Sequence, residues 1–173
     1  MAGGLEFTVE QKALREVAKA LRQESDGKQL RKDLIAAITA VLTPLREEVR
    51  GSILSMESGG LPHEGQGLRQ AIAEKTVVQV RTGGRATGAA IRTKNTGMPR
   101  GFKHAARRLN ARKGWRHPVF ARVTRNGEVD VWVRQVGKPE WFDDTIRKHR
   151  RQYTRNVTAV LAVMARRIAS RSH

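Results

Sequence analysis

The chain has 173 residues and a mass of 19.3 kDa, a length that suits a single domain. It carries 34 Lys and Arg residues against 16 Asp and Glu residues, a formal net charge of +18, and it contains no cysteine. Disulfides, thiolate metal sites and cysteine nucleophiles are therefore excluded, and acidic or polyanionic partners are expected.

The N-terminal third is predicted to be helical. Leu14, Val17 and Leu21 recur at helical spacing, and Thr8 with Gln11 fits a capping box for this first helix. A second helix is expected from the break at residues 25–27 to about residue 56. Pro44 should stop or kink it, with Thr43 as the cap of a new helix, because proline lacks a backbone N–H group.

The middle of the chain is predicted to contain short elements. We expect a helix over residues 67–75, strands over residues 76–81 and 89–93 around a turn at Gly83-Gly84, and a short helix over residues 102–109. Residues 119–124 and 129–134 alternate as the strands of a β-hairpin around Asn126-Gly127. Six of the eight aromatic residues lie between Phe102 and Phe142, which places the expected compact centre there.

A long helix is predicted after Pro139, ending near residue 170. The predicted fold class is therefore α+β: N-terminal helices, a small antiparallel sheet with the Asn126-Gly127 hairpin, and a long C-terminal helix packed on the sheet. We divide the chain into an N-terminal helical segment, residues 1–62, and an α+β core, residues 63–173, within one domain overall. The sequence leaves open whether the N-terminal helices pack on that core or project from it.

Catalytic and cofactor chemistry finds little support in the sequence. The five histidines are scattered without ligand spacing, and Asp143-Asp144 fall in the first turn of a helix, where carboxylates complement the helix dipole. The Gly83-Gly84 turn lacks the Gly-Lys-Ser/Thr ending of a phosphate-binding loop. We therefore expect no enzyme, no catalytic residue, no cofactor and no metal.

The positive charge is concentrated in sectors of the chain. Residues 75–127 contain 14 basic residues and no carboxylate, and residues 145–173 contain eight basic residues and no carboxylate. This pattern is compatible with phosphate contact without sequence reading, with an interface for an acidic protein, or with a solvated face. The candidate basic contact surface consists of Arg100, Lys103, Arg107, Arg108, Arg112, Lys113, Arg116, Arg147, Arg150 and Arg151.

The order of several short motifs resembles one known family. The segment Gly-Leu-Arg-Gln-Ala-Ile-Ala (67–73) precedes a strand and Gly83-Gly84, and Gly-Trp-Arg-His-Pro-Val-Phe (114–120) precedes Val-Trp-Val (131–133), Gln135, Pro139 and Trp141-Phe142. Over about residues 65–170 this order is similar to the tail-completion proteins in the neck and minor tail of long-tailed phages, particularly those of actinobacterial hosts. The chain departs from that family at Ala121, where glycine is frequent, and in its strongly basic residues 102–113.

The resemblance implies a structural virion protein. Such proteins form a homo-oligomeric ring, commonly of six subunits, that terminates or completes the tail tube and joins it to the head-side connector around the DNA channel. They are assembled in the host cytoplasm, with tail-tube and connector proteins as partners, DNA in the channel as a further non-specific contact and no membrane. The expected interface or core anchors are Trp115, His117, Pro118, Phe120, Trp132, Trp141 and Phe142.

An alternative from a different class stays open. The same charge pattern suits a non-enzymatic, sequence-independent nucleic-acid-binding protein. No apolar stretch approaches the ~18–20 residues of a membrane span, and no secretory signal is visible, so an intracellular or virion-type protein is expected.

Overall fold

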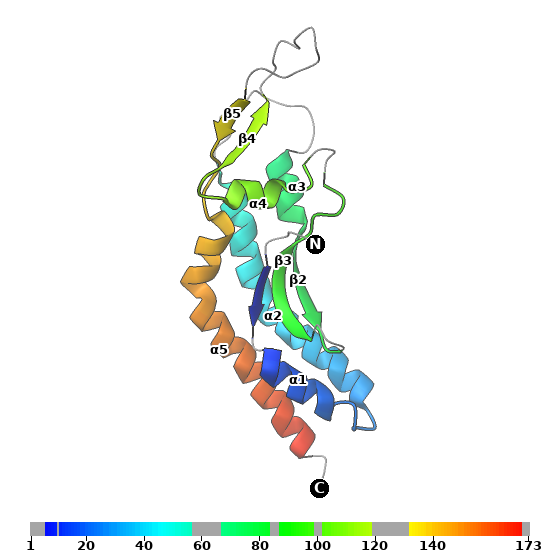
Figure 1. Ribbon diagram of the computed structural model, residues 1–173. Helices are drawn as coiled ribbons and strands as arrows, with labels where there is room; N and C mark the ends of the chain where they lie inside the picture. Colours follow the sequence, from blue (N-terminus) through cyan, green and yellow to red (C-terminus); the bar gives the residue numbers. More distant parts are fainter. Residues whose placement is uncertain are drawn as a thin grey trace.

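The computed structural model of the chain describes residues 6–9, 11–56, 67–83, 87–98, 102–118 and 132–170. Two long helices, α2 (Gly27–Leu54) and α5 (Trp141–Ala169), run side by side along most of its length (Figure 1). Each buries a stripe of apolar residues at intervals of three, four or seven, the spacing that keeps side chains on one helical face. The stripe on α2 includes Leu30, Leu34, Ile38, Leu42, Leu45, Val49 and Ile53.

A three-stranded antiparallel sheet covers one side of α2. Its strand order is β1 (Glu6–Val9), β3 (Gly88–Thr93), β2 (Thr76–Arg81), so the strand that is central in the sheet is the last of the three in sequence. Val78 lies opposite Ile91 and Val80 opposite Ala89, and this face of the sheet joins the core. Helix α1 (Gln11–Ala20) packs against α5 and β3.

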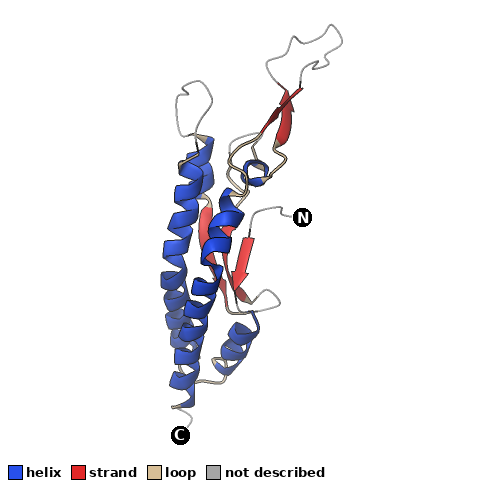
Figure 2. Cartoon of the chain, turned by 90° about the vertical axis from the view of Figure 1, so that its left-hand side faces the viewer, coloured by secondary structure: helices blue, strands red, loops and turns tan. Residues whose placement is uncertain are grey.

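The remaining elements lie towards the end of the molecule where α5 begins (Figures 1 and 2). They are α3 (Leu68–Glu74), α4 (Ala105–Asn110) and a second, two-stranded sheet of β4 (Trp115–Pro118) and β5 (Trp132–Gln135). Figure 2 shows β4 and β5 extending beyond the long helices. Among the described residues, no helix combines the length and the apolar character needed to cross a membrane.

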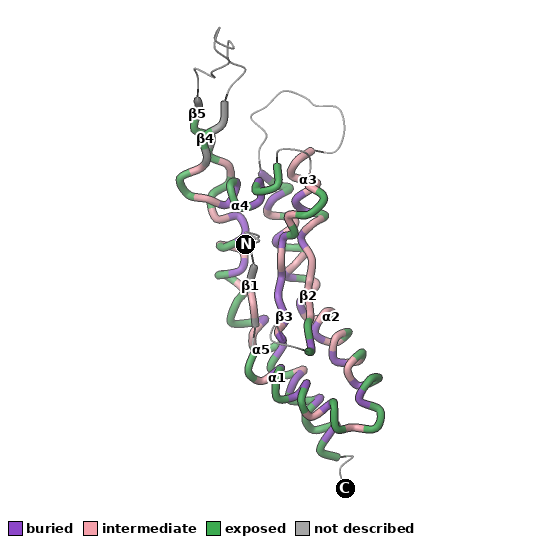
Figure 3. The backbone as a smooth tube through the Cα atoms, turned by 45° about the vertical axis from the view of Figure 1, so that its right-hand side comes forward, coloured by how far each residue is buried: buried purple, intermediate pink, exposed green. Residues whose placement is uncertain are grey.

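The buried hydrophobic residues that the structure describes form a core cluster that includes residues from Leu14 to Ile168. Figure 3 shows buried positions along both long helices and the three-stranded sheet. Helices from residues 1–62 and elements from residues 63–173 both contribute to it, so the N-terminal helices pack on the rest of the chain. The α+β class predicted from the sequence is confirmed. Helix α5 contacts the three-stranded sheet at β1 and lies chiefly along α2.

Among the described residues, the core is not centred between Phe102 and Phe142 as expected. Trp141 and Phe142 are buried at 1% exposure each, but Phe102 is 48% exposed, and most of the described core residues are aliphatic residues of α1, α2 and α5. The side chains of Trp115, Phe120 and Trp132 lie outside the described part of the chain. The positions of the aromatic residues were a poor guide to the core. Leu, Ile and Val side chains on two packed helices bury an apolar area comparable to that of aromatic side chains.

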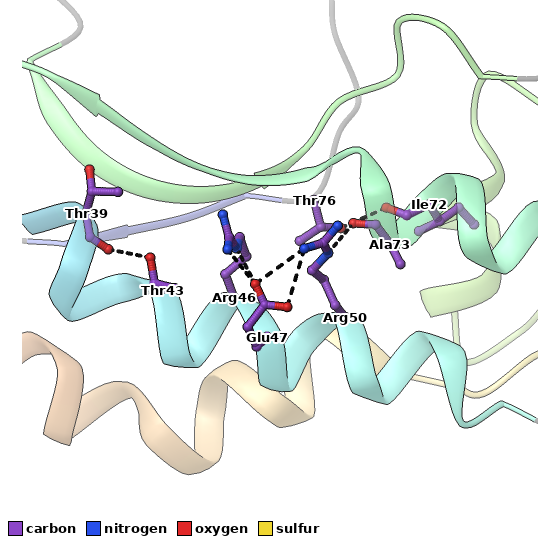
Figure 4. Close-up of polar contacts among 8 residues, drawn as sticks. All are labelled: Thr39, Thr43, Arg46, Glu47, Arg50, Ile72, Ala73 and Thr76. Atoms are coloured by element: carbon purple, nitrogen blue, oxygen red, sulfur yellow. Dashed lines mark hydrogen bonds and ion pairs between the residues drawn. The ribbon is translucent and has the colours of Figure 1, made fainter. Parts of the chain in front are cut away.

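Two local predictions at the N-terminal end are contradicted in whole or in part. Thr8 lies in β1 opposite Ala90 and α1 begins at Gln11, so Thr8 belongs to a strand and is not the N-cap residue of this helix. Pro44 lies inside α2, so the expected stop, with Thr43 as the cap of a new helix, is wrong. Pro44 and Ala40 are both exposed, so water can reach the carbonyl that loses its helical donor, and the Thr43 hydroxyl donates to the Thr39 carbonyl at 2.8 Å (Figure 4).

Most of the other predicted elements correspond to described ones. The expected helices at residues 67–75 and 102–109 match α3 and α4, and the strands at residues 76–81 and 89–93 match β2 and β3. The strands β4 and β5 pair antiparallel from Trp115 opposite Gln135 to Pro118 opposite Trp132. The predicted hairpin is described only in part: β5 includes residues 132–134 of its second strand, whereas its first strand, residues 119–124, and the Asn126-Gly127 turn lie outside the described residues.

Candidate interaction surface at the α4–α5 junction

The start of α5 is capped by a residue from another helix. Asn110, at the end of α4, accepts a hydrogen bond on its side-chain oxygen from the Phe142 N–H at 2.9 Å, and its amide nitrogen donates to Asp143 Oδ2 at 2.6 Å. Its backbone carbonyl accepts the Glu140 N–H at 2.8 Å. The first N–H groups of a helix have no partner within it, so Asn110 satisfies α5 while tying it to α4.

Close packing fixes α4 on the same point. The Trp141 indole donates to the Ala106 carbonyl at 3.3 Å, and the Trp141 carbonyl accepts the Ser52 hydroxyl of α2 at 3.0 Å. Gly137 lies so near α4 that a Cβ there would be 2.8 Å from Leu109 Cδ2. We call α4, residues 111–114, residues 136–140 and the first turn of α5 the α4–α5 junction, and its backbone is held from three elements.

Glu140 lies at the centre of an ion-pair group on this junction. Its carboxylate contacts Arg112 Nη2 at 2.8 Å and Arg147 Nη2 at 3.2 Å. The hydrogen bond from Arg112 is the main reason why the pKa of Glu140 lies below its ordinary value, and the same bond raises the pKa of Arg112. Glu140 has a φ of 56°, a left-handed conformation that is uncommon outside glycine, so tertiary contacts hold it there.

Beside this group, α4 presents basic side chains, Arg107 and Arg108, that form no ion pair with a described residue. His104, Arg107, Arg108, Ala111 and Gly114 line a shallow depression, and Lys103 and Lys113 are exposed next to it in the sequence. Beyond it, Arg116 on β4 stands directly opposite Arg134 on β5, and both are exposed.

The structure brings together part of the predicted basic surface. Arg112 and Arg147, from distant parts of the sequence, meet at Glu140, while Lys103, Arg107, Arg108, Lys113 and Arg116 are exposed on or next to α4. Arg150 and Arg151 are exposed one turn further along α5, and Arg100 lies outside the described residues. Glu140, Asn110 and Arg134 were not predicted from the sequence as members of the site.

The predicted anchors divide into two groups. Trp141 and Phe142 are core residues of this protein, with their rings edge to face at a centroid distance of 5.7 Å. Trp115, His117 and Pro118 lie on β4 and Trp132 lies on β5, but their side chains, like Phe120 as a whole, are outside the described part of the chain.

The chemistry of this surface is that of anion recognition. Guanidinium groups present planar donors that match carboxylate and phosphate oxygens, and a fixed backbone reduces the ordering cost of binding. In the described residues, no group of three or more His, Asp or Glu side chains is arranged to hold a metal ion. No family model, no curated protein and no solved structure matches the chain.

Proposed function

We propose that this protein is a structural, non-catalytic component of a phage neck, which forms a ring at the head-proximal end of the tail tube and joins the tube to the head-side connector. The proposal rests on the order of motifs over residues 65–170, from Gly67-Leu68 to the aromatic pair that opens α5. The structural observation that supports it is the α4–α5 junction. This junction presents a basic surface on a backbone held by tertiary contacts, at one end of an elongated chain.

Such a surface suits docking between subunits or onto an acidic neighbour. A directed positive face steers association and selects complementary partners, and it needs no active-site cleft. Because a ring is built from heterologous contacts, each subunit needs two different faces, and this chain is strongly asymmetric along its length.

Charge neutralisation on α4 tests the role of the surface. The triple variant Arg107→Gln, Arg108→Gln, Lys113→Gln leaves Asn110, Arg112 and Glu140 in place, so the fold should be retained. We expect it to impair the joining of isolated heads and tails, since it removes three charges from the docking face. The matched control is Lys12→Gln, Arg15→Gln, Lys19→Gln on α1, whose three exposed side chains lie far from α4. Normal joining by the α4 variant would contradict this role.

One observation favours a second candidate function, sequence-independent nucleic-acid binding. Arg116 and Arg134 are opposed in the β4–β5 pair and both are exposed, so two guanidinium groups are presented on the same side of the pair. If this function is correct, the purified protein retains duplex DNA without any tail component, and its affinity falls steeply with salt.

A further inference from the structure

Strand β2 forms an edge of the three-stranded sheet. The Lys94 N–H donates to the Lys75 carbonyl at 2.9 Å, which makes this pair a hydrogen-bonded one in the antiparallel ladder. Such pairs recur at every second residue, so Val77, Gln79 and Arg81 bond to β3. The backbone groups of Val78 and Val80 therefore point away from the sheet.

No described residue bonds to these outward backbone groups. The only described strand that pairs with β2 is β3, and neither Val78 nor Val80 takes part in a backbone hydrogen bond outside that ladder. Residues 77–80 are all partly exposed, whereas residues 89–91 of the neighbouring β3 are buried (Figure 3). An edge with unpaired N–H and C=O groups is a template for a further strand.

Residues 77–80 of β2 contain none of the sequence features that commonly prevent pairing at an edge. Natural edges carry a proline, a bulge or an inward-pointing charge that prevents pairing. The segment Val-Val-Gln-Val (77–80) is uncharged and contains no proline, and its register with β3 is continuous. It is rich in the β-branched residues that pack well beside a neighbouring strand.

Basic side chains surround this edge. On α2, Arg46 and Arg50 extend on the side that faces β2 and share the carboxylate of Glu47 between them (Figure 4). Arg50 also donates to the Ala73 carbonyl at 2.9 Å, which fixes its position below the start of the strand. Arg81 ends β2 and is exposed, and Arg92 lies opposite Val77 on the outer face. The surroundings therefore disfavour a second copy of this basic chain and favour an acidic segment.

We propose that the edge of β2 binds an extended, acidic segment of a partner protein, which adds to the sheet as a fourth strand through the backbone groups of Val78 and Val80. Backbone pairing supplies a sequence-tolerant affinity, and the arginines around the edge select carboxylates on the segment. This proposal does not depend on the neck function, because it concerns a different face of the molecule from the α4–α5 junction.

Synthetic peptides test the proposal on the full-length protein. The probe is a capped eight-residue peptide that alternates valine and glutamate, and its charge control has lysine at every glutamate. Two further versions of the glutamate peptide carry N-methyl groups on every second amide. One version is methylated on the amides of one edge of the extended peptide, and the other version on the amides of the opposite edge. Binding is measured by fluorescence anisotropy, and hydrogen exchange is followed at the Val78 and Val80 amides.

The expected result is specific to strand addition. The glutamate peptide binds and slows exchange at Val78 and Val80 by about tenfold or more, the lysine peptide does not bind, and only one of the two methylated peptides loses binding. Four results would overturn the proposal: no binding, equal behaviour of the two methylated peptides, equal binding of the lysine peptide, or slow exchange at both amides before any peptide is added. Slow exchange that grows with protein concentration would instead identify a second copy as the occupant.

Two pairs of variants provide an independent test. Val80→Pro removes the outward N–H and should abolish binding, whereas Val80→Thr keeps that group and should retain it, with thermal unfolding used to verify both folds. Arg81→Glu should lower the affinity for the glutamate peptide by several-fold. Arg155→Glu, the same change at an exposed position of α5, should leave this affinity within about twofold of the original value. Equal effects within either pair would contradict the proposal.

Discussion

The side-chain oxygen of Asn110 accepts a hydrogen bond from the backbone N–H of Phe142 at 2.9 Å, although 32 positions separate the two residues. This contact makes α4 the cap of α5. It explains how a helix of six residues, too short to be stable alone, can hold a basic surface in a fixed position.

Replacement of Asn110 should therefore destabilise the whole protein. Asn110→Ala removes the cap and leaves the Phe142 N–H buried without its partner, so we expect a loss of about 1–3 kcal/mol in the free energy of unfolding. Asn156→Ala, an exposed change on α5, is the control and should stay within about 0.5 kcal/mol of the original protein. Urea unfolding measures both. An effect of Asn110→Ala no larger than that of the control would show that the cap is dispensable.

Two glycines of α2 should respond in opposite directions to the same substitution. A Cβ at Gly27 would lie 1.9 Å from the Leu21 carbonyl oxygen, so Gly27→Ala must displace the turn between α1 and α2 and should cost on the order of 2 kcal/mol or more. Gly51 has no neighbouring atom within 4 Å of such a Cβ, and Gly51→Ala should stabilise the helix by about 0.5–1 kcal/mol. Thermal unfolding of the two variants would contradict this view if both changed stability in the same direction.

The ion pairs of Glu140 should make stability depend on pH. Because the pKa of Glu140 is lower in the folded protein, chiefly through the hydrogen bond from Arg112, its stabilising effect is present above the ordinary glutamate pKa of about 4.3 and is lost as the pH falls through the lower folded value. The stability difference between the original protein and Glu140→Gln should therefore shrink with acidification. In an NMR titration, Arg112→Gln should move the Glu140 pKa upward. A pH-independent difference would contradict this assignment.

The single tyrosine of the chain reports on the contact between α2 and α5. Burial, the charge of Glu48 and a hydrogen bond to it together raise the pKa of Tyr153 above its ordinary value of about 10. His149 Nε2 lies 2.7 Å from the same carboxylate. The tyrosinate absorbance should thus appear late in an alkaline titration, and Glu48→Gln should shift it to lower pH without abolishing the part due to burial. The neutral tyrosine stabilises the fold below its unfolded pKa, and this effect is lost as the pH rises through the folded pKa. An ordinary midpoint would contradict the burial of this hydroxyl.

Local sequence patterns predicted most elements because each depends on neighbours along the chain. The apolar stripe of α5 and the β-branched residues of β2 are properties of the segments themselves. The strand at Glu6–Val9 was missed because four residues carry too little periodicity, and its strand character comes from pairing with β3, some eighty positions away. Pro44 misled the prediction because only the folded structure shows that its side of α2 faces solvent.

The candidate site was only partly predictable for the same reason. Charge counts identified Arg107, Arg108 and Arg112 as basic residues near one another, but the ion pair of Arg112 with Glu140 joins two segments whose proximity depends on the packing of α4 on α5. Asn110 could not be recognised from the sequence as a cap. Helix caps are predicted from residues directly before a helix, whereas Asn110 lies 32 positions before the Phe142 N–H that it binds.

The measurement that tests the neck proposal most directly is the native mass of the purified protein, determined by light scattering at low and near-physiological salt, with and without random duplex DNA. The proposal predicts a closed oligomer, about six times the 19.3 kDa subunit mass, that is unaffected by DNA near physiological salt. A monomer or dimer that retains DNA and releases it steeply with salt would contradict the proposal and would support the nucleic-acid-binding function instead.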